Sequence, residues 1–511
     1  MSLGPGMSLA AARQLGVRLS DDGVAWAVRL GVVCYCGVVL ALLAIGSPYA
    51  VIAIAAPIGA LVGLWGLSRP EGVASLMLLT LFLRKALPQL FGMDPFLPAF
   101  AGVLAALAIH VWHNQGRLPR LGTTEVLIAA YIAWNLFSWL QPHYYNTLPG
   151  PPDTRPVWRF VATGTIIPLT MYVVGRVVFR TERTARLLLW TVIGYGAYSA
   201  FVSICQFHAP SLVWPRYIVT DPVWVGRANG VPDQPVMNGL LLVSGYVAAI
   251  LVCASRETGR IQRAACLVVI IATSYGVYLT HTRAAWLAYL IVTVAGALLL
   301  RRARPYFLTV LVITAVLVIG EWSTFTSSNR DAGGVGSVNE VDDRLNLMAT
   351  QIWAFKREPW FGYGIGTFPT LNTYHHQQLS LSVPWVRGYG IASHENELGI
   401  LVELGLLGLT LWVGVLVLIW RNLVRAVRSL DPDALLGRPY AFLASLMLLA
   451  QILGGLTVDL RFFDFNNALV FLVVGSAVGL GESVRGPTSR PAASRRVGRT
   501  DVSGEPAPRQ T

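Results

Sequence analysis

The sequence predicts an all-α, polytopic integral membrane protein with about 12–14 transmembrane helices and one long loop on the outer side of the membrane. Three observations support this fold class. Hydrophobic residues make up 54% and charged residues only 13% of the 511-residue chain, a composition that excludes an ordinary soluble protein. Apolar stretches of about 20 residues, long enough to cross roughly 30 Å of hydrocarbon, recur along the chain. Basic residues gather in alternate connections between these stretches, which indicates one fixed orientation in the bilayer.

The apolar stretches give the order of regions along the chain. Residues 1–25 precede the first span, 26–320 hold the first group of helices, 321–395 form the long outer loop, and 396–482 hold the last helices. Residues 483–511 are rich in Ser, Pro, Gly and Arg, and we predict a disordered cytoplasmic tail. Because residues 1–25 lack the pattern of a cleaved signal peptide, we expect the first span to remain as an anchor. The predicted spans are 26–46, 48–67, 71–91, 95–112, 123–141, 159–178, 185–207, 236–254, 264–280, 284–300, 305–320, 396–420, 438–457 and 466–482.

Charge predicts the orientation, because Lys and Arg next to spans stay on the cytoplasmic side. This rule places both termini in the cytoplasm and the loop 321–395 outside. The net charge of +13 is mostly this topological signal plus the tail, so we do not infer nucleic-acid binding. The inward clusters are Arg117 and Arg120; Arg176, Arg180, Arg183 and Arg186; Arg256, Arg260 and Arg263; Arg301, Arg302 and Arg304; Arg421, Arg425 and Arg428; and the arginines of the tail.

Cysteines and carboxylates indicate neither a disulfide framework nor a metal centre. The five cysteines are odd in number and fall within predicted spans. No cluster of carboxylates suggests a metal site, and His375 and His376 are adjacent, which is poor spacing for joint ligation. We therefore expect no cofactor and a metal-independent mechanism.

The outer loop 321–395 changes character along its length. It begins with a polar, Gly-containing stretch and continues with DDRLNLMATQIWAFKREPWFG, in which apolar residues recur at helical spacing until Pro359. This pattern predicts an amphipathic helix lying on the membrane, with Asp342 or Asp343 capping its first turn and Arg344 near the bilayer surface. The glycines of GYGIGTF do not follow a strand, so a dinucleotide-binding loop is rejected.

Three candidate residues are predicted on the outer side of the membrane, namely Arg283, Arg344 and His394. The two arginines differ in this from most other arginines of the chain, which are predicted on the cytoplasmic side. A guanidinium stays charged and grips phosphate oxygens in a bidentate fork. An imidazole with a pKa near 6.5 can act as a base around neutral pH. The combination suggests chemistry at the membrane surface on an anionic, lipid-linked substrate.

Four segments carry a recognisable pattern when taken in order: RANGVPDQPVMNGLLL (227–242), THTRAAWLAYLI (280–291), RLNLMATQIWAFKREPWFGYGIGTF (344–368) and SHENELGILVELGLLG (393–408). Together they resemble the O-antigen ligase and polymerase superfamily of bacterial envelope glycosyltransferases. The resemblance implies a GT-C-like membrane fold. One departure is Glu395, which separates His394 from Asn396 where many members have the His and Asn adjacent.

The resemblance implies transfer of a glycan from undecaprenyl or another polyprenyl diphosphate to an acceptor hydroxyl, on the periplasmic face of the bacterial inner membrane. We assign His394 as the base and Arg283 and Arg344 to the diphosphate, with Arg227 and Arg216 assisting. The acceptor is lipid A core, a repeat unit or a protein. A ligase is favoured over a polysaccharide polymerase or a protein O-oligosaccharyltransferase, which use the same donor chemistry.

Other candidate residues have structural alternatives that stay open. His281 is expected to be structural, and Asn396 and Glu397 accompany His394. Glu403 lies within a span, where a carboxylate is costly unless it is paired or functional. Asp464, with Asp459 and Arg461, forms an outward charged patch for which a local salt bridge and acceptor binding are both considered. For the outer arginines, the structural alternative is that they anchor the protein to lipid phosphate. For His394, it is that the residue caps a helix.

Two other classes of function are considered. A polysaccharide transporter or flippase would also be polytopic, but it would place ionisable residues near the midplane and show internal repeats or broken helices. A non-catalytic scaffold would tolerate loss of His394. The charges gather at the outer face and no repeat is visible, so the transferase is favoured.

Overall fold

The computed structural model describes residues 69–89, 94–114, 119, 121–141, 157–220, 222, 224–329, 334, 339–383 and 390–485. This part of the chain is helical and contains no strand, which confirms the all-α class. Every predicted span from 95–112 onward coincides with a helix, whereas the predicted span 71–91 is helical only to Phe82. Four predicted regions lie outside the described residues: 1–25, 26–46, 48–67 and 483–511. The exception is the end of the last helix, which extends to residue 485.

Seven helical stretches within the described residues are long and apolar enough to cross a membrane. Three shorter apolar helices are α3 (Pro70–Phe82), α12 (Arg283–Leu299) and α13 (Arg304–Gly320). Two further helices of 18 residues are α5 (Thr123–Leu140) and α18 (Arg438–Gly455). The seven are α4 (Phe96–His113), α6 to α7 (Val157–Val178), α8 (Glu182–His208), α10 (Pro235–Ala254), α11 (Arg260–Leu279), α17 (Asn396–Ser429) and α19 (Asp464–Arg485).

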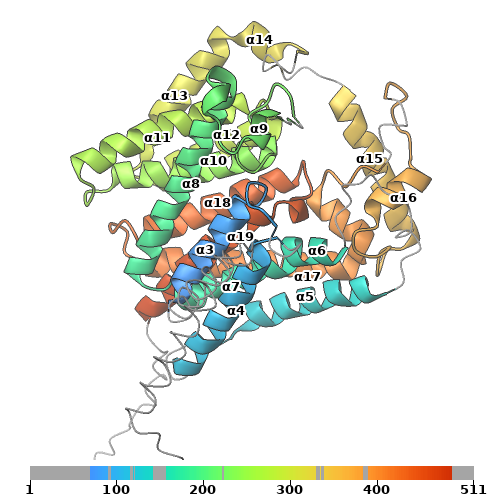
Figure 1. The fold of residues 1–511 in the computed structure, drawn as a ribbon, viewed down its shortest axis with the longest axis horizontal. Helices are drawn as coiled ribbons and strands as arrows, with labels where there is room; N and C mark the ends of the chain where they lie inside the picture. Colours follow the sequence, from blue (N-terminus) through green and yellow to red (C-terminus); the bar gives the residue numbers. More distant parts are fainter. Residues whose placement is uncertain are drawn as a thin grey trace, which may run out of the picture. The chain divides into compact units, whose positions relative to one another are not determined.

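The most buried of these seven spans are those that contain α7 (Ile167–Val178), α10 and α19, and α10 lies among α8, α11 and α12 (Figure 1). The apolar window of α10 is 100% buried by other helices, although its sequence resembles that of any lipid-facing span. Helices α7 and α19 touch through glycines: a Cβ on Gly175 would lie 2.2 Å from the carbonyl oxygen of Leu472, and a Cβ on Gly475 2.1 Å from that of Tyr172. Small residues are therefore required where these two backbones meet, as is typical of helix packing in membranes.

Helix α17 is broken at Gly405, and the outer loop fills the break. Gly405 has a φ of +69°, which only glycine adopts readily. The segment after α15 supplies backbone partners on both sides of it: Tyr363 N donates to Val402 O at 2.9 Å, and Leu406 N donates to Pro359 O at 2.8 Å. These bonds satisfy backbone groups that the helix itself leaves free, and they fasten the outer loop to the first half of α17.

The predicted amphipathic helix is α15 (Asn339–Arg357), beside the beginning of α17 together with α16 (Phe368–His375) (Figure 1). The expected cap at Asp342 or Asp343 is wrong, since the helix begins at Asn339 and both acids lie inside its first turns. The face of α15 that packs into the protein is mixed, while an apolar stripe on the other side is exposed. The buried residues include Asn346, Leu347, Thr350, Gln351 and Ala354, and the exposed stripe is Val341, Leu345 and Ile352. An outward apolar stripe is what a helix at a lipid surface requires.

Candidate functional site

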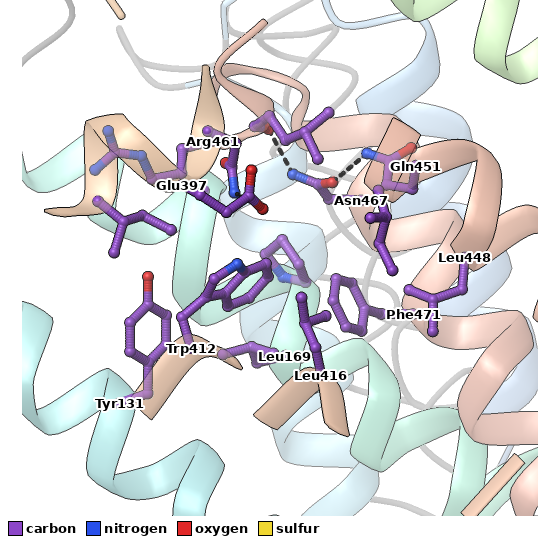
Figure 2. A pocket seen from close by; sticks show the side chains of 16 residues that line it. Tyr131, Leu169, Glu397, Trp412, Leu416, Leu448, Gln451, Arg461, Asn467 and Phe471 are labelled. Carbon is purple, nitrogen blue, oxygen red and sulfur yellow. Dashed lines mark hydrogen bonds between the residues drawn. The ribbon is translucent and has the colours of Figure 1, made fainter. Parts of the chain in front are cut away.

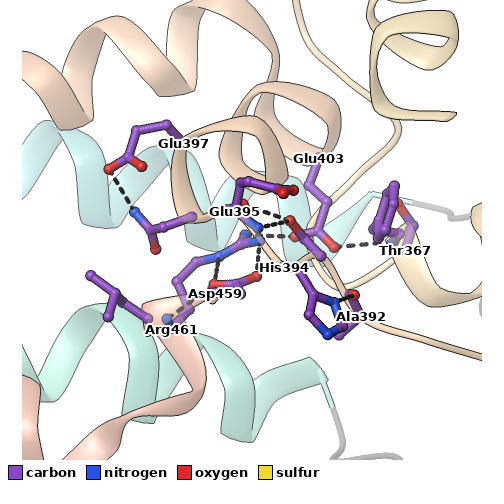
Figure 3. A network of polar contacts seen from close by, with 12 residues as sticks. Thr367, Ala392, His394, Glu395, Glu397, Glu403, Asp459 and Arg461 are labelled. Carbon is purple, nitrogen blue, oxygen red and sulfur yellow. Dashed lines mark hydrogen bonds and ion pairs between the residues drawn. The ribbon is translucent and has the colours of Figure 1, made fainter. Parts of the chain in front are cut away.

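His394 stands two residues before α17, with its ring held by the backbone. Its Nδ1 lies 3.1 Å from the carbonyl oxygen of Ala392 (Figure 3). A proton on Nδ1 donates to this carbonyl and leaves the lone pair on Nε2, which is the form that a general base needs. Burial lowers the pKa of His394, and the nearby Arg344 guanidinium lowers it further. The imidazole is therefore neutral at pH 7 and able to accept a proton.

The structure brings Arg344, one of the two predicted phosphate-binding arginines, into electrostatic reach of both Arg283 and His394. Arg344 lies in the second turn of α15, and Arg283 is the first residue of α12. Burial lowers the pKa of Arg344, Glu395 opposes this effect, and the charge of Arg283 adds to it. Two guanidinium groups within electrostatic reach of each other are favourable for a ligand with several negative charges.

Arg227 connects the loop before α10 to helix α15. Its Nη2 lies 3.4 Å from Oε1 of Glu340, one turn before Arg344 on α15, and its guanidinium lies 5.3 Å from the ring centre of Trp224. Arg227 is thus close to the predicted site but shares its charge with Glu340. Whether it binds phosphate stays a prediction.

His281 and Arg216 make local contacts that organise loops. His281 has a φ of +43°, and its Nδ1 lies 2.7 Å from the carbonyl oxygen of Gly226, so its ring joins the turn before Arg283 to the loop before α10. Arg216 Nη1 donates to the carbonyl oxygens of Pro210 and Ser211 at 2.9 and 3.2 Å. These bonds give Arg216 a structural reason to be present that needs no substrate.

Glu395, which departs from the family pattern in the sequence, is a buried carboxylate next to His394. Burial raises its pKa to about 7, against the opposing effects of Arg344 and a hydrogen bond from Gln351. Its Oε2 has no hydrogen-bond partner among the residues that the structure describes. Glu395 therefore combines a raised pKa with a position next to His394, the predicted base, and within electrostatic reach of Arg344, a predicted phosphate-binding residue. Its position directly after His394 was the only sequence signal.

We expect the charge on Glu395 to make stability depend on pH. Its pKa is about 7 in the folded protein, above the value of about 4.3 expected on unfolding, so the stabilisation present at low pH is lost as pH rises through 7. The loss should amount to about 1–3 kcal/mol. Wild type should melt at a lower temperature at pH 8 than at pH 5.5 in detergent, and Glu395→Gln should remove most of this difference. Glu358→Gln, an exposed carboxylate just after α15, is the control that should retain it.

A buried ion network lies behind His394 (Figure 3). Arg461 Nη1 lies 2.6 Å from Oε2 of Glu403, and its Nη2 lies 2.7 Å from Oδ2 of Asp459. The other oxygen of Glu403 accepts a hydrogen bond from the backbone N of Phe368 at 3.1 Å. All three charged residues are at least 96% buried. Glu403 is thus part of a structural ion pair with Arg461. The network connects α17, the start of α16 and the loop before α19.

Asp464 and Asn396 are also held by neighbours. The carboxylate of Asp464 pairs with Arg84, so the charged patch 459–464 consists of separate pairs rather than one surface. Asn396 is 1% exposed, and its Nδ2 donates to Oε1 of Glu397 at 3.1 Å. Neither contact reaches His394 itself.

A small cavity lies beside Glu397, inside the bundle (Figure 2). Its volume is about 20 Å³, and its polar side is formed by Gln451, Asn467 and Arg461. A cavity needs roughly 10–15 Å³ by this measure to hold one water molecule. The cavity therefore has room for a single water and excludes a sugar or a diphosphate.

The described part of the chain contains no group of three or more His, Cys, Asp or Glu side chains arranged to hold a metal ion.

Residues 267–413 match the family model described as O-Antigen ligase, and this segment contains Arg283, Arg344 and His394. No curated protein matches the chain. The match confirms the resemblance in the sequence: the chain is a multi-pass membrane protein whose segment 267–413 matches the O-antigen ligase family model.

Proposed function

We propose that the protein is an O-antigen ligase-type glycosyltransferase that moves a glycan from polyprenyl diphosphate to an acceptor hydroxyl. The observation that carries this proposal is the position of His394, a neutral base, within electrostatic reach of Arg344, which itself lies within electrostatic reach of Arg283. A base and two cations are what the reaction needs, since a proton must leave the acceptor while charge develops on the diphosphate. A metal is not required for either task in this scheme.

The bond changes balance with these residues alone. The acceptor O–H gives its proton to Nε2 of His394, and the oxygen forms a bond to the anomeric carbon of the donor sugar. The bond from that carbon to the phosphate oxygen breaks, and the electron pair leaves with the lipid diphosphate. Arg283 and Arg344 stabilise the leaving group as its charge grows, and Arg227 would extend this binding surface. Base assistance contributes roughly 10²–10⁴-fold in rate.

The proposal includes the location inferred from the charge pattern. Both termini lie in the cytoplasm, and the site faces the periplasm from the bacterial inner membrane, where undecaprenyl diphosphate presents the glycan. The outward apolar stripe of α15 supports this placement, because it would hold Arg344 at the level of lipid headgroups. The acceptor is lipid A core; a repeat unit or a protein would make the enzyme a polymerase or an O-oligosaccharyltransferase with the same donor chemistry.

The test is glycan transfer by the purified protein from a polyprenyl diphosphate-linked oligosaccharide, with each of the three acceptors offered separately and with and without chelator. We expect lipid A core to become glycosylated and chelator to have no effect. Donor binding is measured in parallel by competition with glycan-free polyprenyl diphosphate. A protein that binds neither donor nor diphosphate is not this transferase. Movement of the lipid-linked glycan across liposomes without any transfer would support the flippase instead.

A further inference from the structure

A second pocket, separate from His394, lies at the outer ends of α3, α10 and α19. Its volume is about 110 Å³, room for several water molecules rather than one. Charged and aromatic side chains line it together, namely Arg84, Lys85, Asp233, Asp464, Phe82 and Phe465. None of these residues comes from the segment 267–413 that matches the O-antigen ligase family model.

The charges of the pocket cancel in pairs. Arg84 donates to Asp464, and Lys85 donates to Oδ2 of Asp233. A phosphate or carboxylate ligand would have to displace one of these carboxylates, so the pocket is poorly suited to an anion. It offers alternating donors and acceptors beside aromatic rings, which suits a ligand that has hydroxyl groups and an apolar face.

One acceptor in the pocket is unused. The side chain of Asp233 is only 4% exposed, yet its Oδ1 has no hydrogen-bond partner among the described residues. Asp233 has a φ of +56°, so the backbone holds this carboxylate in a conformation uncommon for a residue other than glycine. A buried carboxylate oxygen without a partner is costly, and a ligand hydroxyl that donates to it would remove that cost.

Two short chain segments connect the pocket to the candidate site. Arg227, paired with Glu340 near Arg344, is six residues from Asp233, a reach of at most about 22 Å. Asp459, whose charge affects His394, is five residues from Asp464, a reach of at most about 18 Å. The pocket thus lies within a few sugar units of the proposed reaction centre.

We propose that this pocket binds one uncharged sugar ring of a glycan substrate, away from the bond that reacts. This inference rests on the proposed function for its substrate class. One hydroxyl donates to Oδ1 of Asp233, Arg84 and Lys85 donate to ring or hydroxyl oxygens, and Phe82 and Phe465 cover the apolar face of the ring. The glycan comes either from the donor or from the acceptor.

The experiment measures binding rather than activity, on the full-length protein in detergent. The probes are oligosaccharide released by mild acid from the lipid-linked pool of the source cells, oligosaccharide released from their finished surface polysaccharide, and glycan-free polyprenyl diphosphate. Variants are Asp233→Asn, Arg283→Ala and Asp94→Asn. Asp94 pairs with Arg159 and does not line the pocket, so Asp94→Asn is a matched carboxylate-to-amide control. Elution profile and melting temperature show that each variant is folded.

We expect wild type to bind at least one oligosaccharide, and Asp233→Asn to bind it about tenfold more weakly, because a hydrogen bond to a charged group is lost. Asp94→Asn and Arg283→Ala should bind it as wild type does. The oligosaccharide that responds identifies the donor or the acceptor as its source. No oligosaccharide binding in wild type, or equal binding by Asp233→Asn, overturns the pocket assignment. Loss of polyprenyl diphosphate binding in Arg283→Ala tests the proposed function separately, so the two can fail independently.

Discussion

His394→Ala is expected to reduce glycan transfer by about 10²–10⁴-fold while leaving donor binding unchanged. The imidazole accepts the acceptor's proton in our scheme and makes no contribution to holding the diphosphate, so its loss should appear in kcat rather than in KM. The measurement is steady-state transfer by purified protein together with competition binding of polyprenyl diphosphate. His375→Ala is the matched control from the same outer region, since His375 stacks on Trp353 with ring centres 4.9 Å apart.

The pH profile distinguishes a base from a structural histidine. Because burial and Arg344 lower the pKa of His394, its neutral form persists below pH 6.5, and the acidic limb of kcat/KM should lie below that value. Arg344→Gln removes one of these causes and should move the limb to higher pH, besides weakening donor binding. A His394→Ala protein that transfers glycan at the wild-type rate would show that another group, or none, takes the proton.

The sequence was sufficient for the helices because each depends on a local run of apolar residues. It also predicts Arg283, Arg344 and His394 on one side of the membrane. The structure brings Arg344 into electrostatic reach of the other two, while their side of the membrane and their chemical roles stay predictions. The break at Gly405 could not be predicted, since it occurs within a continuous apolar run and depends on backbone bonds from residues 359–363. Periodicity contains no information about partners so far along the chain.

The pKa of Glu395 and the ion-pair partner of Glu403 could not be predicted from the sequence either. The raised pKa of Glu395 comes from its burial, and burial of a residue before a span follows from how α15 and α16 pack there. A structural ion pair was one reading of Glu403, but its partner, Arg461, is 58 residues away in another connection. The outward face of α15 shows the same limit: the pattern predicts an amphipathic helix, while the side that enters the protein depends on polar partners such as Ser393 for Gln351.

Arg461→Met is expected to destabilise the fold by about 3–5 kcal/mol. A loss of this size is enough to prevent the segments around Arg461 from packing correctly. The guanidinium compensates two buried carboxylates, Glu403 and Asp459, and both would remain buried without a cation. It also lies 4.8 Å from the ring centre of Phe160, so the change removes packing on that ring. Yield of monodisperse protein and melting temperature in detergent measure the effect.

A charge-neutral triple variant separates uncompensated charge from loss of shape. Arg461→Met combined with Glu403→Gln and Asp459→Asn removes all three charges but retains the acceptors that serve the backbone N of Phe368 and of Arg461. Replacing a whole buried ion network is commonly neutral, whereas removing one partner is not. We therefore expect the triple variant to recover most of the melting temperature that Arg461→Met loses. If the triple variant is as unstable as the single one, the three charges do not stabilise the fold through mutual compensation, and the contacts of Arg461 with Phe160 would be the better explanation.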